Sequence, residues 1–234
     1  MPVASDAPPA FGRSDVKAVV VTTASLPKPN AAELADTVAA RWQAGPWPAE
    51  QVALSVFTSG DGTSVLTYAQ WSARGALEES LKDVGSVSWA NAPGALLGEG
   101  ADNGVRTTGP LPFGIYRTVR GTAVTEEDPV PVSFPVAFFT MADEASATAW
   151  VDGLLSAEEE NEGDERAYPG AIAANFHVSL DGTRVLVLSE WLSEEAASQH
   201  IADVWDPILA HFGGDAGALY RHHTTLNAPE KAAG

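Results

Sequence analysis

The sequence of 234 residues contains no cysteine, few basic residues and no long hydrophobic run. The absence of cysteine excludes disulfides, thiolate nucleophiles and sulfur-ligated zinc or iron–sulfur sites. Thirteen Lys and Arg against 31 Asp and Glu give a net charge of −18. Nucleic-acid and anionic-membrane surfaces need clustered cations, so this composition argues against both. No segment approaches the roughly 18 apolar residues of a membrane span, and the N-terminus lacks the basic and apolar regions of a signal peptide. We therefore expect a soluble, cytoplasmic protein.

An internal repeat organises the sequence. Residues 52–84 align with residues 172–204 without a gap, at a constant offset of 120, and eleven of the 33 positions are identical. The identities centre on S-x-D-G-T-x-V-L, which begins at Ser59 in the first copy and at Ser179 in the second. A fixed period of this kind is typical of a duplicated structural unit. The chain is therefore interpreted as a tandem duplication.

Each copy predicts the same order of elements. In the first, residues 17–23 form an apolar, β-branched strand, and Asn30 with Glu33 predicts a helix start. Asp61-Gly62 and Asp181-Gly182 are hairpin signals between two strands. A further helix is expected from Ser72 in the first copy and from Ser193 in the second, each followed by a last strand, 113–121 or 218–226.

The order β-α-β-β-α-β in both copies predicts an α+β fold of two ferredoxin-like repeats. Two such sheets in one chain would pack face to face and form an intramolecular dimeric α+β barrel that encloses a cavity. The expected organisation is a flexible tail 1–15, a first repeat 16–121, a linker 122–131, a second repeat 132–226 and a flexible tail 227–234.

The segment from the S-x-D-G-T motif through Trp191 to His200 resembles the antibiotic biosynthesis monooxygenase family. The resemblance covers about 17–121 and 132–226 and implies the dimeric α+β barrel, here as a pseudo-dimer within one chain. Its relatives include cofactor-free oxygenases that convert anthrones to quinones, quinol oxygenases, haem-degrading enzymes and proteins without known activity. The implied partners are a small aromatic substrate and O₂, and no cofactor is expected. The pseudo-dimer could also associate further into a homodimer, which the sequence leaves open.

The resemblance also implies candidate catalytic residues. His177 matches the His that anthrone oxygenases carry fourteen residues before a strand Trp, which here is Trp191. The first copy has Phe57 and Trp71 at these places. The Asn that these oxygenases hold four residues before the Trp is replaced by Thr67 and Val187.

His177 alternates with Phe176 and Val178, so it is expected on the open face of its sheet, pointing into the cavity, if those neighbours face the helices. There, a neutral imidazole could take a proton from an electron-rich aromatic substrate, whose carbanion could then reduce O₂. A hydrogen-bonded structural His is the alternative. Trp71 and Trp191 are interpreted either as fold residues or as cavity walls that stack on a flat substrate.

Two repeated pairs on the fourth strands complete the candidate substrate-binding residues. They are Tyr116 with Arg117 and Tyr220 with Arg221. Adjacent strand residues face opposite ways, so one of each pair is expected to line the cavity. Arg could hold an enolate or carboxylate there, or form a structural ion pair. His222 and His223 diverge in the same way and lack a metal-ligand spacing, so no metal site is expected.

The sequence thus predicts a cofactor-independent monooxygenase acting on an aromatic polyketide-like substrate, an anthrone or a quinol, with His177 as base and Trp191 as cavity wall. One alternative is a non-catalytic ligand-binding or scaffold protein of the same fold, and another is a polyketide cyclase. In a third, a haem-binding or haem-degrading protein, the resemblance implies His200 as the haem ligand if its side chain points inward. Otherwise His200 is expected to have a structural or surface role, because the family motif contains such a His widely.

Overall fold

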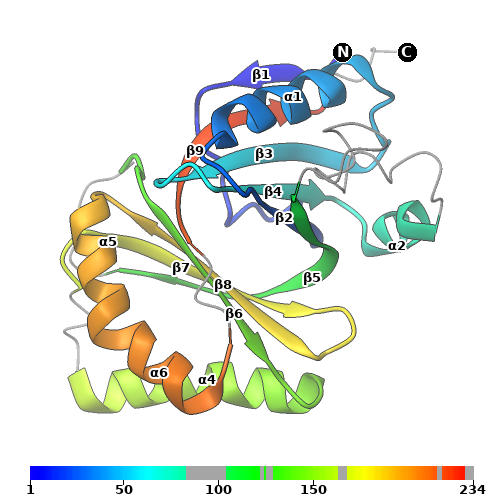
Figure 1. Ribbon diagram of the computed structural model, residues 1–234. Helices are drawn as coiled ribbons and strands as arrows, with labels where there is room; N and C mark the ends of the chain where they lie inside the picture. Colours follow the sequence, from blue (N-terminus) through cyan, green and yellow to red (C-terminus); the bar gives the residue numbers. More distant parts are fainter. Residues whose placement is uncertain (83–103, 122–123, 125–128, 163–167, 215–217, 230–234) are drawn as a thin grey trace. The chain divides into compact units, whose positions relative to one another are not determined.

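The computed structural model describes residues 1–82, 104–121, 124, 129–162, 168–214 and 218–229 (Figure 1). The chain forms two compact units: Met1–Pro112 with His222–Gly234, and Phe113–Arg221. These limits differ from the predicted repeat boundaries because the strands β5 (Arg106–Arg120) and β9 (Leu219–Asn227) each contribute residues to both units. Most of the predicted linker, residues 122–123 and 125–128, lies outside the described residues.

The first unit has the ferredoxin-like strand order. Its elements are β2 (Ala18–Ser25), α1 (Ala31–Ala44), β3 (Gln51–Ser59), β4 (Ser64–Trp71), α2 (Arg74–Lys82) and the first part of β5. The strands lie in the order β5-β2-β4-β3, so the last strand of the repeat neighbours the first. The end of β9 and the short strand β1 (Val3–Ser5) extend this sheet beyond β3.

The second unit repeats this order. Its elements are β6 (Phe134–Thr140), α4 (Glu144–Glu162), β7 (Ala171–Ser179), β8 (Arg184–Trp191), α5 (Glu194–His200), a π-helical turn η2 (Ile201–Trp205), α6 (Asp206–Phe212) and the start of β9. The strand order is β9-β6-β8-β7, with β5 pairing along the far edge of β7. The predicted α+β class with two ferredoxin-like repeats is confirmed.

The central hairpin of each repeat is held by the same hydrogen bonds. Asp61 Oδ1 accepts from Ser59 Oγ at 2.7 Å and from the Thr63 backbone N–H at 2.9 Å. Asp181 Oδ1 accepts from Ser179 Oγ at 2.6 Å and from the Thr183 N–H at 3.0 Å. The hairpin glycine has φ of 73° in the first repeat and 74° in the second, a conformation that favours glycine. The repeated S-x-D-G-T motif is therefore a structural device that fixes the hairpin.

The hairpin glycine of the first repeat also completes the start of α1. The Gly62 carbonyl accepts hydrogen bonds from the backbone N–H groups of Asn30 and Ala31, both at 2.9 Å. The Asn30 side chain instead donates to Glu33 Oε2 at 2.7 Å and makes no capping bond to the backbone. The helix begins where the sequence predicts, but the hairpin supplies the acceptor that the capping box was expected to supply.

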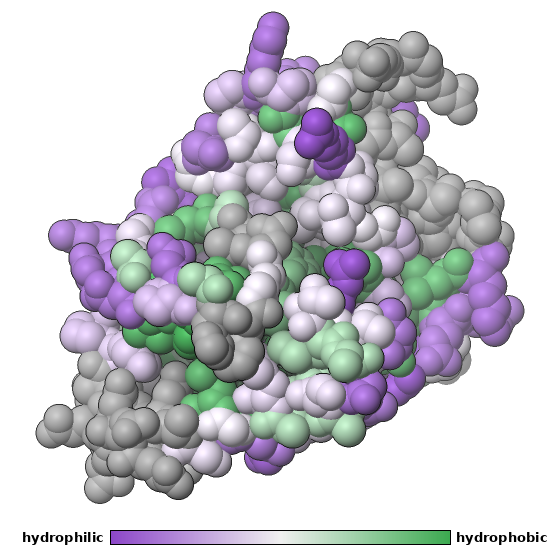
Figure 2. Space-filling model, turned by 60° about the horizontal axis from the view of Figure 1, so that its bottom comes forward, coloured by the Kyte–Doolittle hydropathy of each residue, from purple (hydrophilic) through white to green (hydrophobic). Residues whose placement is uncertain are grey.

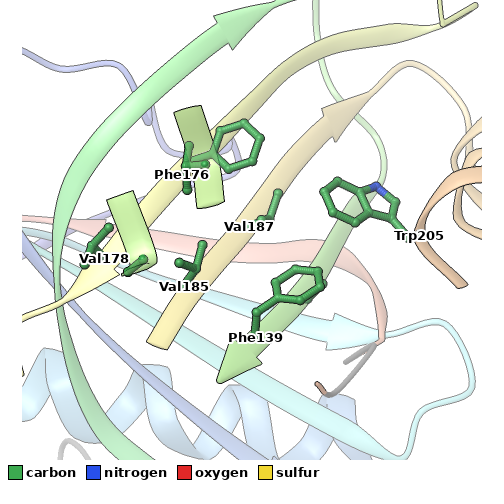
Figure 3. Close-up of a cluster of buried hydrophobic side chains, with 9 residues drawn as sticks. Phe139, Phe176, Val178, Val185, Val187 and Trp205 are labelled. Atoms are coloured by element: carbon green, nitrogen blue, oxygen red, sulfur yellow. The ribbon is translucent and has the colours of Figure 1, made fainter. Parts of the chain in front are cut away.

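The core of the second unit lies between its sheet and its helices (Figure 3). Its buried members from the sheet include Phe139, Phe176 and Val187, and Ala147 of α4 and Trp205 of η2 pack against them. Figure 1 shows α4, α5 and α6 on one face of this sheet. On the face of the molecule in Figure 2, hydrophobic surface occurs in separate patches between polar residues.

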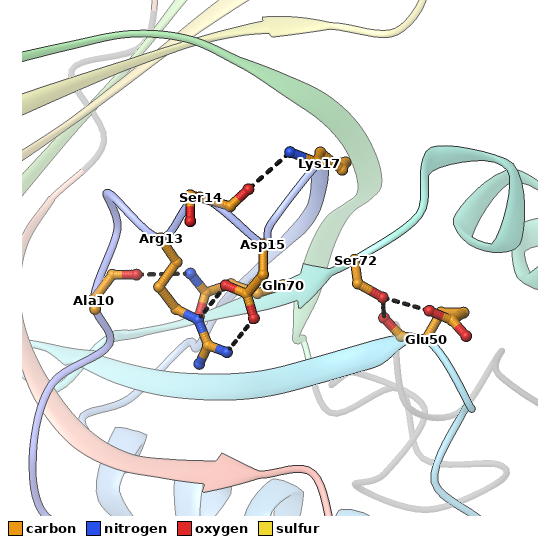
Figure 4. A network of polar contacts seen from close by, with 8 residues as sticks. All are labelled: Ala10, Arg13, Ser14, Asp15, Lys17, Glu50, Gln70 and Ser72. Carbon is orange, nitrogen blue, oxygen red and sulfur yellow. Dashed lines mark hydrogen bonds and ion pairs between the residues drawn. The ribbon is translucent and has the colours of Figure 1, made fainter.

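The N-terminal segment is bound to the first unit, contrary to the flexible tail expected for residues 1–15. Val3–Ser5 pair with β9, and the Gln70 side chain donates to the Ala10 carbonyl at 3.0 Å (Figure 4). The Phe11 ring is 2% exposed and lies 5.1 Å from the Tyr68 ring, edge to face. Arg13 and Asp15 form a two-pronged ion pair beside it. The sequence signal for this docking was a single aromatic residue within a polar segment.

We predict that Phe11→Ala lowers the free energy of unfolding by about 3 kcal/mol, because a buried aromatic side chain is lost and a cavity remains. Urea denaturation at pH 7 measures this loss. Val3→Ala is the matched control in the same segment: Val3 is 58% exposed, and its replacement is expected to change stability by less than about 0.5 kcal/mol. Equal small effects of both changes would mean that the segment is not docked.

Candidate functional site

Strand alternation in the second unit separates two sets of side chains. Phe176, Val178, Val185 and Val187 belong to the core beneath the helices (Figure 3). His177 and its strand partner Leu186 therefore lie on the opposite face of the sheet. This is the orientation that the sequence predicts for His177.

A cavity of about 60 Å³ lies on the helix-covered face of this unit. It is enclosed by the ends of β5, β7 and β8 and by α4, α5 and η2, and most of its lining is apolar. Its aromatic lining residues are Tyr168, Phe176, Trp191, His200 and Trp205. His177 is not among the lining residues. The cavity thus brings together Trp191 and His200, which the family motif contains, and leaves His177 on the other face.

His200 is at the centre of an aromatic cluster. Its imidazole ring lies 4.3 Å from the Tyr168 ring, 4.9 Å from the Trp191 ring and 6.1 Å from the Trp205 ring. Burial lowers the pKa of His200 to about 4, against the opposing attraction of Asp203. Its Nδ1 has no hydrogen-bond partner among the residues that the structure describes. His200 is therefore a neutral imidazole at pH 7, and its buried Nδ1 makes no hydrogen bond within the described residues.

Trp191 forms one wall of the cavity. Its side chain is 2% exposed, and its Nε1 donates a hydrogen bond to Ser189 Oγ at 3.0 Å. Ser193 begins α5 by accepting from the Ala196 N–H, as its predicted position requires. This cap fixes the start of the helix that carries His200.

His177 is completely buried, and burial lowers its pKa to about 4, with hydrogen bonding to the backbone at Leu186 and Asn175 acting in the opposite direction. A polar cluster around the buried Asn175, which the sequence analysis missed, lies on the same face. Asn175 Nδ2 donates to Glu190 Oε1 at 2.9 Å, and Asn175 Oδ1 accepts from Thr118 Oγ1 at 3.0 Å. Burial raises the pKa of Glu190, while hydrogen bonding to Asn175 and attraction to Arg120 lower it.

The first repeated Tyr–Arg pair contacts α4. Tyr116 donates to Asp152 Oδ2 at 2.8 Å, and Arg117 donates to Asp152 Oδ1 at 3.2 Å. Strand alternation predicts opposite directions for these neighbours. The register of β5 shifts between Ile115 and Arg117, and such an irregularity lets both reach one carboxylate. The hydrogen bond to Asp152 raises the pKa of Tyr116.

The second pair takes two directions. The Tyr220 side chain is 3% exposed, and Tyr220 pairs with Phe134 across β9 and β6. The Arg221 guanidinium is more than half exposed and forms an ion pair with Glu194 at the start of α5. None of the four residues lines the cavity, and both arginines have the structural ion pairs that the sequence left open as an alternative.

In the first unit, Phe57 and Trp71 are both buried on opposite faces of the sheet. The Phe57 ring lies 5.7 Å from His222, whose Nε2 is 2.8 Å from Thr225 Oγ1. His223 Nε2 is 2.8 Å from Asp36 Oδ1 on α1, so the two histidines diverge. The described residues contain no cluster of His, Asp and Glu suited to a metal ion, and within them no helix is long and apolar enough to span a membrane.

Comparison with known proteins identifies the fold. No family model and no curated protein matches the sequence. Among solved structures, an anthrone oxidase-like protein aligns over 97% of this chain and 99% of its own, at 15% identity and a TM-score of 0.58. A ferredoxin-fold protein of Listeria monocytogenes 4b F2365 related to antibiotic biosynthesis monooxygenases aligns over 92% and 96%, at 8% identity and a TM-score of 0.43.

A monooxygenase-like protein of Listeria innocua aligns over 93% of this chain and 96% of its own, at 9% identity and a TM-score of 0.45. Taken with the strand order of both units, the match to the anthrone oxidase-like protein shows that this chain shares the fold of that protein.

The low pKa of buried His177 predicts an acid-sensitive fold. Its pKa is about 4 in the folded protein, against the ordinary value of 6.5 in an unfolded chain, so the unfolded chain binds more protons between these values. The stability that neutral His177 contributes is therefore full above pH 6.5 and is lost as the pH falls towards 4. We predict that His177→Phe, which introduces the residue of the first repeat, reduces the loss of stability between pH 7 and 4.5 by about 2 kcal/mol.

Urea denaturation at several pH values measures this difference. Val3→Ala is the control, because Val3 is 58% exposed and its side chain carries no titratable group. A His177→Phe protein with the pH dependence of the wild type would show that His177 does not titrate between pH 7 and 4.5.

Proposed function

We propose that the chain is a cofactor-independent monooxygenase that oxidises a small electron-rich aromatic substrate, a quinol or an anthrone, in the cavity of the second unit. The observation that carries this proposal is the convergence of Tyr168, Trp191 and Trp205 on the neutral imidazole of His200. Aromatic walls bind flat rings by stacking, and a few polar atoms orient them.

The chemistry needs a proton acceptor next to an oxidisable ring. His200 Nδ1 takes a proton from the substrate, and the resulting carbanion or enolate gives an electron to O₂. The two radicals combine to a peroxide, which loses water and leaves a carbonyl. In an anthrone, a CH₂ group and one O₂ thus become one C=O and one H₂O, and the proton held by His200 leaves with the water. In a quinol, the keto tautomer supplies the CH₂ group, and the product is a hydroxyquinone and one H₂O. Arg120 lines the same cavity and supplies a positive charge for the anionic intermediate.

His200 takes the place of His177 as proposed base because it lines the cavity and His177 does not. The two histidines share a pKa of about 4, so both are neutral at pH 7. Trp191 keeps the role of cavity wall that the sequence assigns to it. The strand-four residues Arg117 and Arg221 have no part in this proposal, because each is bound to a carboxylate on a helix.

The size of the cavity favours non-catalytic binding of a small ring as a second candidate function. Small-molecule sites usually have volumes of roughly 300–1,000 Å³, and this cavity has about 60 Å³. A haem macrocycle is several times larger than the cavity, and a three-ring anthrone is also larger, so in this conformation the residues around His200 fit neither. An anthrone would need the longer pocket that movement of Trp205 opens. Oxidation and simple binding differ in O₂ consumption.

We predict that His200→Ser, which introduces the residue of the first repeat (Ser80), lowers turnover at least 100-fold, because the proton acceptor is lost. The assay follows O₂ uptake and product absorbance with a panel of hydroquinones and anthrones. His223→Gln is the control and keeps full activity. Full activity of His200→Ser together with loss of activity in His177→Phe would show that the base is His177, on the other face of the sheet. Absence of turnover by the wild-type protein across the panel would favour simple binding.

Trp205 separates the cavity from a smaller one of about 10 Å³. Both cavities are lined by Trp205 and Ser189, and the second is otherwise lined by apolar residues of β6, β8, η2 and α6. Trp205 ends the π-helical turn η2, a geometry often found at functional sites. Movement or removal of its indole would join the two cavities into one longer pocket.

We therefore predict that Trp205→Ala shifts the preference of the protein from one-ring to three-ring aromatic ligands by at least tenfold. Anaerobic calorimetric titration with methylhydroquinone and with 9-anthrone measures the ratio of the two dissociation constants. Trp150→Ala is the control, because Trp150 also packs against Phe139 but lines neither cavity. An unchanged ratio in Trp205→Ala would show that the indole does not set the length of the pocket.

A further inference from the structure

The first repeat carries polar residues at three positions that line the cavity in the second. At the constant offset of 120, Gln51 corresponds to Ala171, Trp71 to Trp191 and Ser80 to His200. Ala171, Trp191 and His200 all line the cavity. The first unit therefore has an indole, a primary amide and a hydroxyl where the second has an indole, a methyl group and an imidazole.

Gln51 and Trp71 have the same backbone pairing as Ala171 and Trp191 in the second repeat. Gln51 and Trp71 are direct partners across β3 and β4, so their side chains lie next to each other on one face of the sheet. The register shifts between Gln51 and Ala53, as it does between Ala171 and Ala173 in the second repeat. Ser80 is on α2, the helix that follows β4 as α5 follows β8.

Four polar atoms of this set are buried without a hydrogen-bond partner in the described part of the chain. They are Nε2 and Oε1 of Gln51, Nε1 of Trp71 and Oγ of Ser80. Gln51 is 1% exposed and Trp71 is 2% exposed. A buried polar group without a partner is destabilising, and several in one place are rare in native proteins.

A single difference between the repeats leaves the indole of Trp71 unpaired. In the second repeat Ser189 accepts the hydrogen bond of Trp191 Nε1 at 3.0 Å. The corresponding residue of the first repeat is Ala69, which has no side-chain acceptor. Within the described residues, the N–H of Trp71 therefore has no acceptor.

We propose that Gln51, Trp71 and Ser80 form a second ligand site, which binds a neutral molecule carrying a carbonyl acceptor and an N–H donor on a flat ring. The Gln51 amide pairs with an amide of the ligand in both directions, and Trp71 donates to its carbonyl. Ser80 can donate or accept. The three side chains are uncharged, so burial of a carboxylate or an ammonium beside them is disfavoured. This site does not depend on oxidation in the second unit.

Benzamide is the probe for this site, with benzoate and toluene as comparison probes. The ¹H–¹⁵N spectrum of the full chain resolves the indole N–H signals, and Trp71→Phe identifies the one that belongs to Trp71. We expect benzamide to shift this signal saturably, because its carbonyl accepts from the indole. Benzoate and toluene at the same concentration are expected to leave it within a tenth of that shift.

Gln51→Ala introduces the residue of the second repeat and is expected to weaken benzamide binding at least tenfold. It is also expected to leave the Tm of the free protein unchanged or higher, because a buried amide without a partner is removed. Gln43→Ala, the same change on α1, is the control and retains wild-type affinity.

Three results would overturn the proposal. The first is a Trp71 indole signal that benzamide does not shift, and the second is an equal shift of this signal by toluene. The third is an unchanged affinity of Gln51→Ala for benzamide. A persistent magnetisation transfer from water to the Trp71 indole at saturating benzamide would show that the place holds ordered water only. O₂ uptake in the second unit is independent of all these outcomes, so failure here is distinct from failure of the oxygenase proposal.

Discussion

The register of the central hairpin in each repeat determines which side chains meet the helices. Ser, Asp, Gly and Thr of the repeated motif close the β3–β4 and β7–β8 turns through the same hydrogen bonds, and both hairpins have the same register shift eight residues earlier. A slip of one residue would exchange the two faces of each strand. Trp71 and Trp191 therefore occupy equivalent places, and the difference between the units comes from the residues around them.

The two units use the same framework for different environments. In the second, Ser189 satisfies the indole of Trp191, and Ala171 leaves space beside the imidazole of His200. In the first, Ala69 leaves the indole of Trp71 without an acceptor, and Gln51 adds two buried polar atoms. A duplicated chain can thus keep one fold while its two helix-covered faces acquire an apolar and a polar character.

The sequence predicted the features that depend on local pattern. The hairpins and the start of α1 follow from turn residues. The position of His177 on the sheet face opposite the helices follows from strand alternation. Alternation failed at Tyr116 and Arg117, because an irregularity in β5 has no sequence signature in a single chain. The docking of Phe11 and the inward position of His200 depend on packing between distant segments, which local pattern does not encode.

The function proposed for the second unit depends on His200 being a neutral imidazole that faces a ligand cavity. Long-range ¹H–¹⁵N spectra of the histidine rings, with His200 identified by His200→Ser, test this most directly. We expect His200 to titrate with a pKa of about 4, and methylhydroquinone added without O₂ to shift its ring signals saturably. A pKa near 6.5 together with unmoved ring signals would contradict this, because His200 would then be exposed to solvent and away from any bound ring.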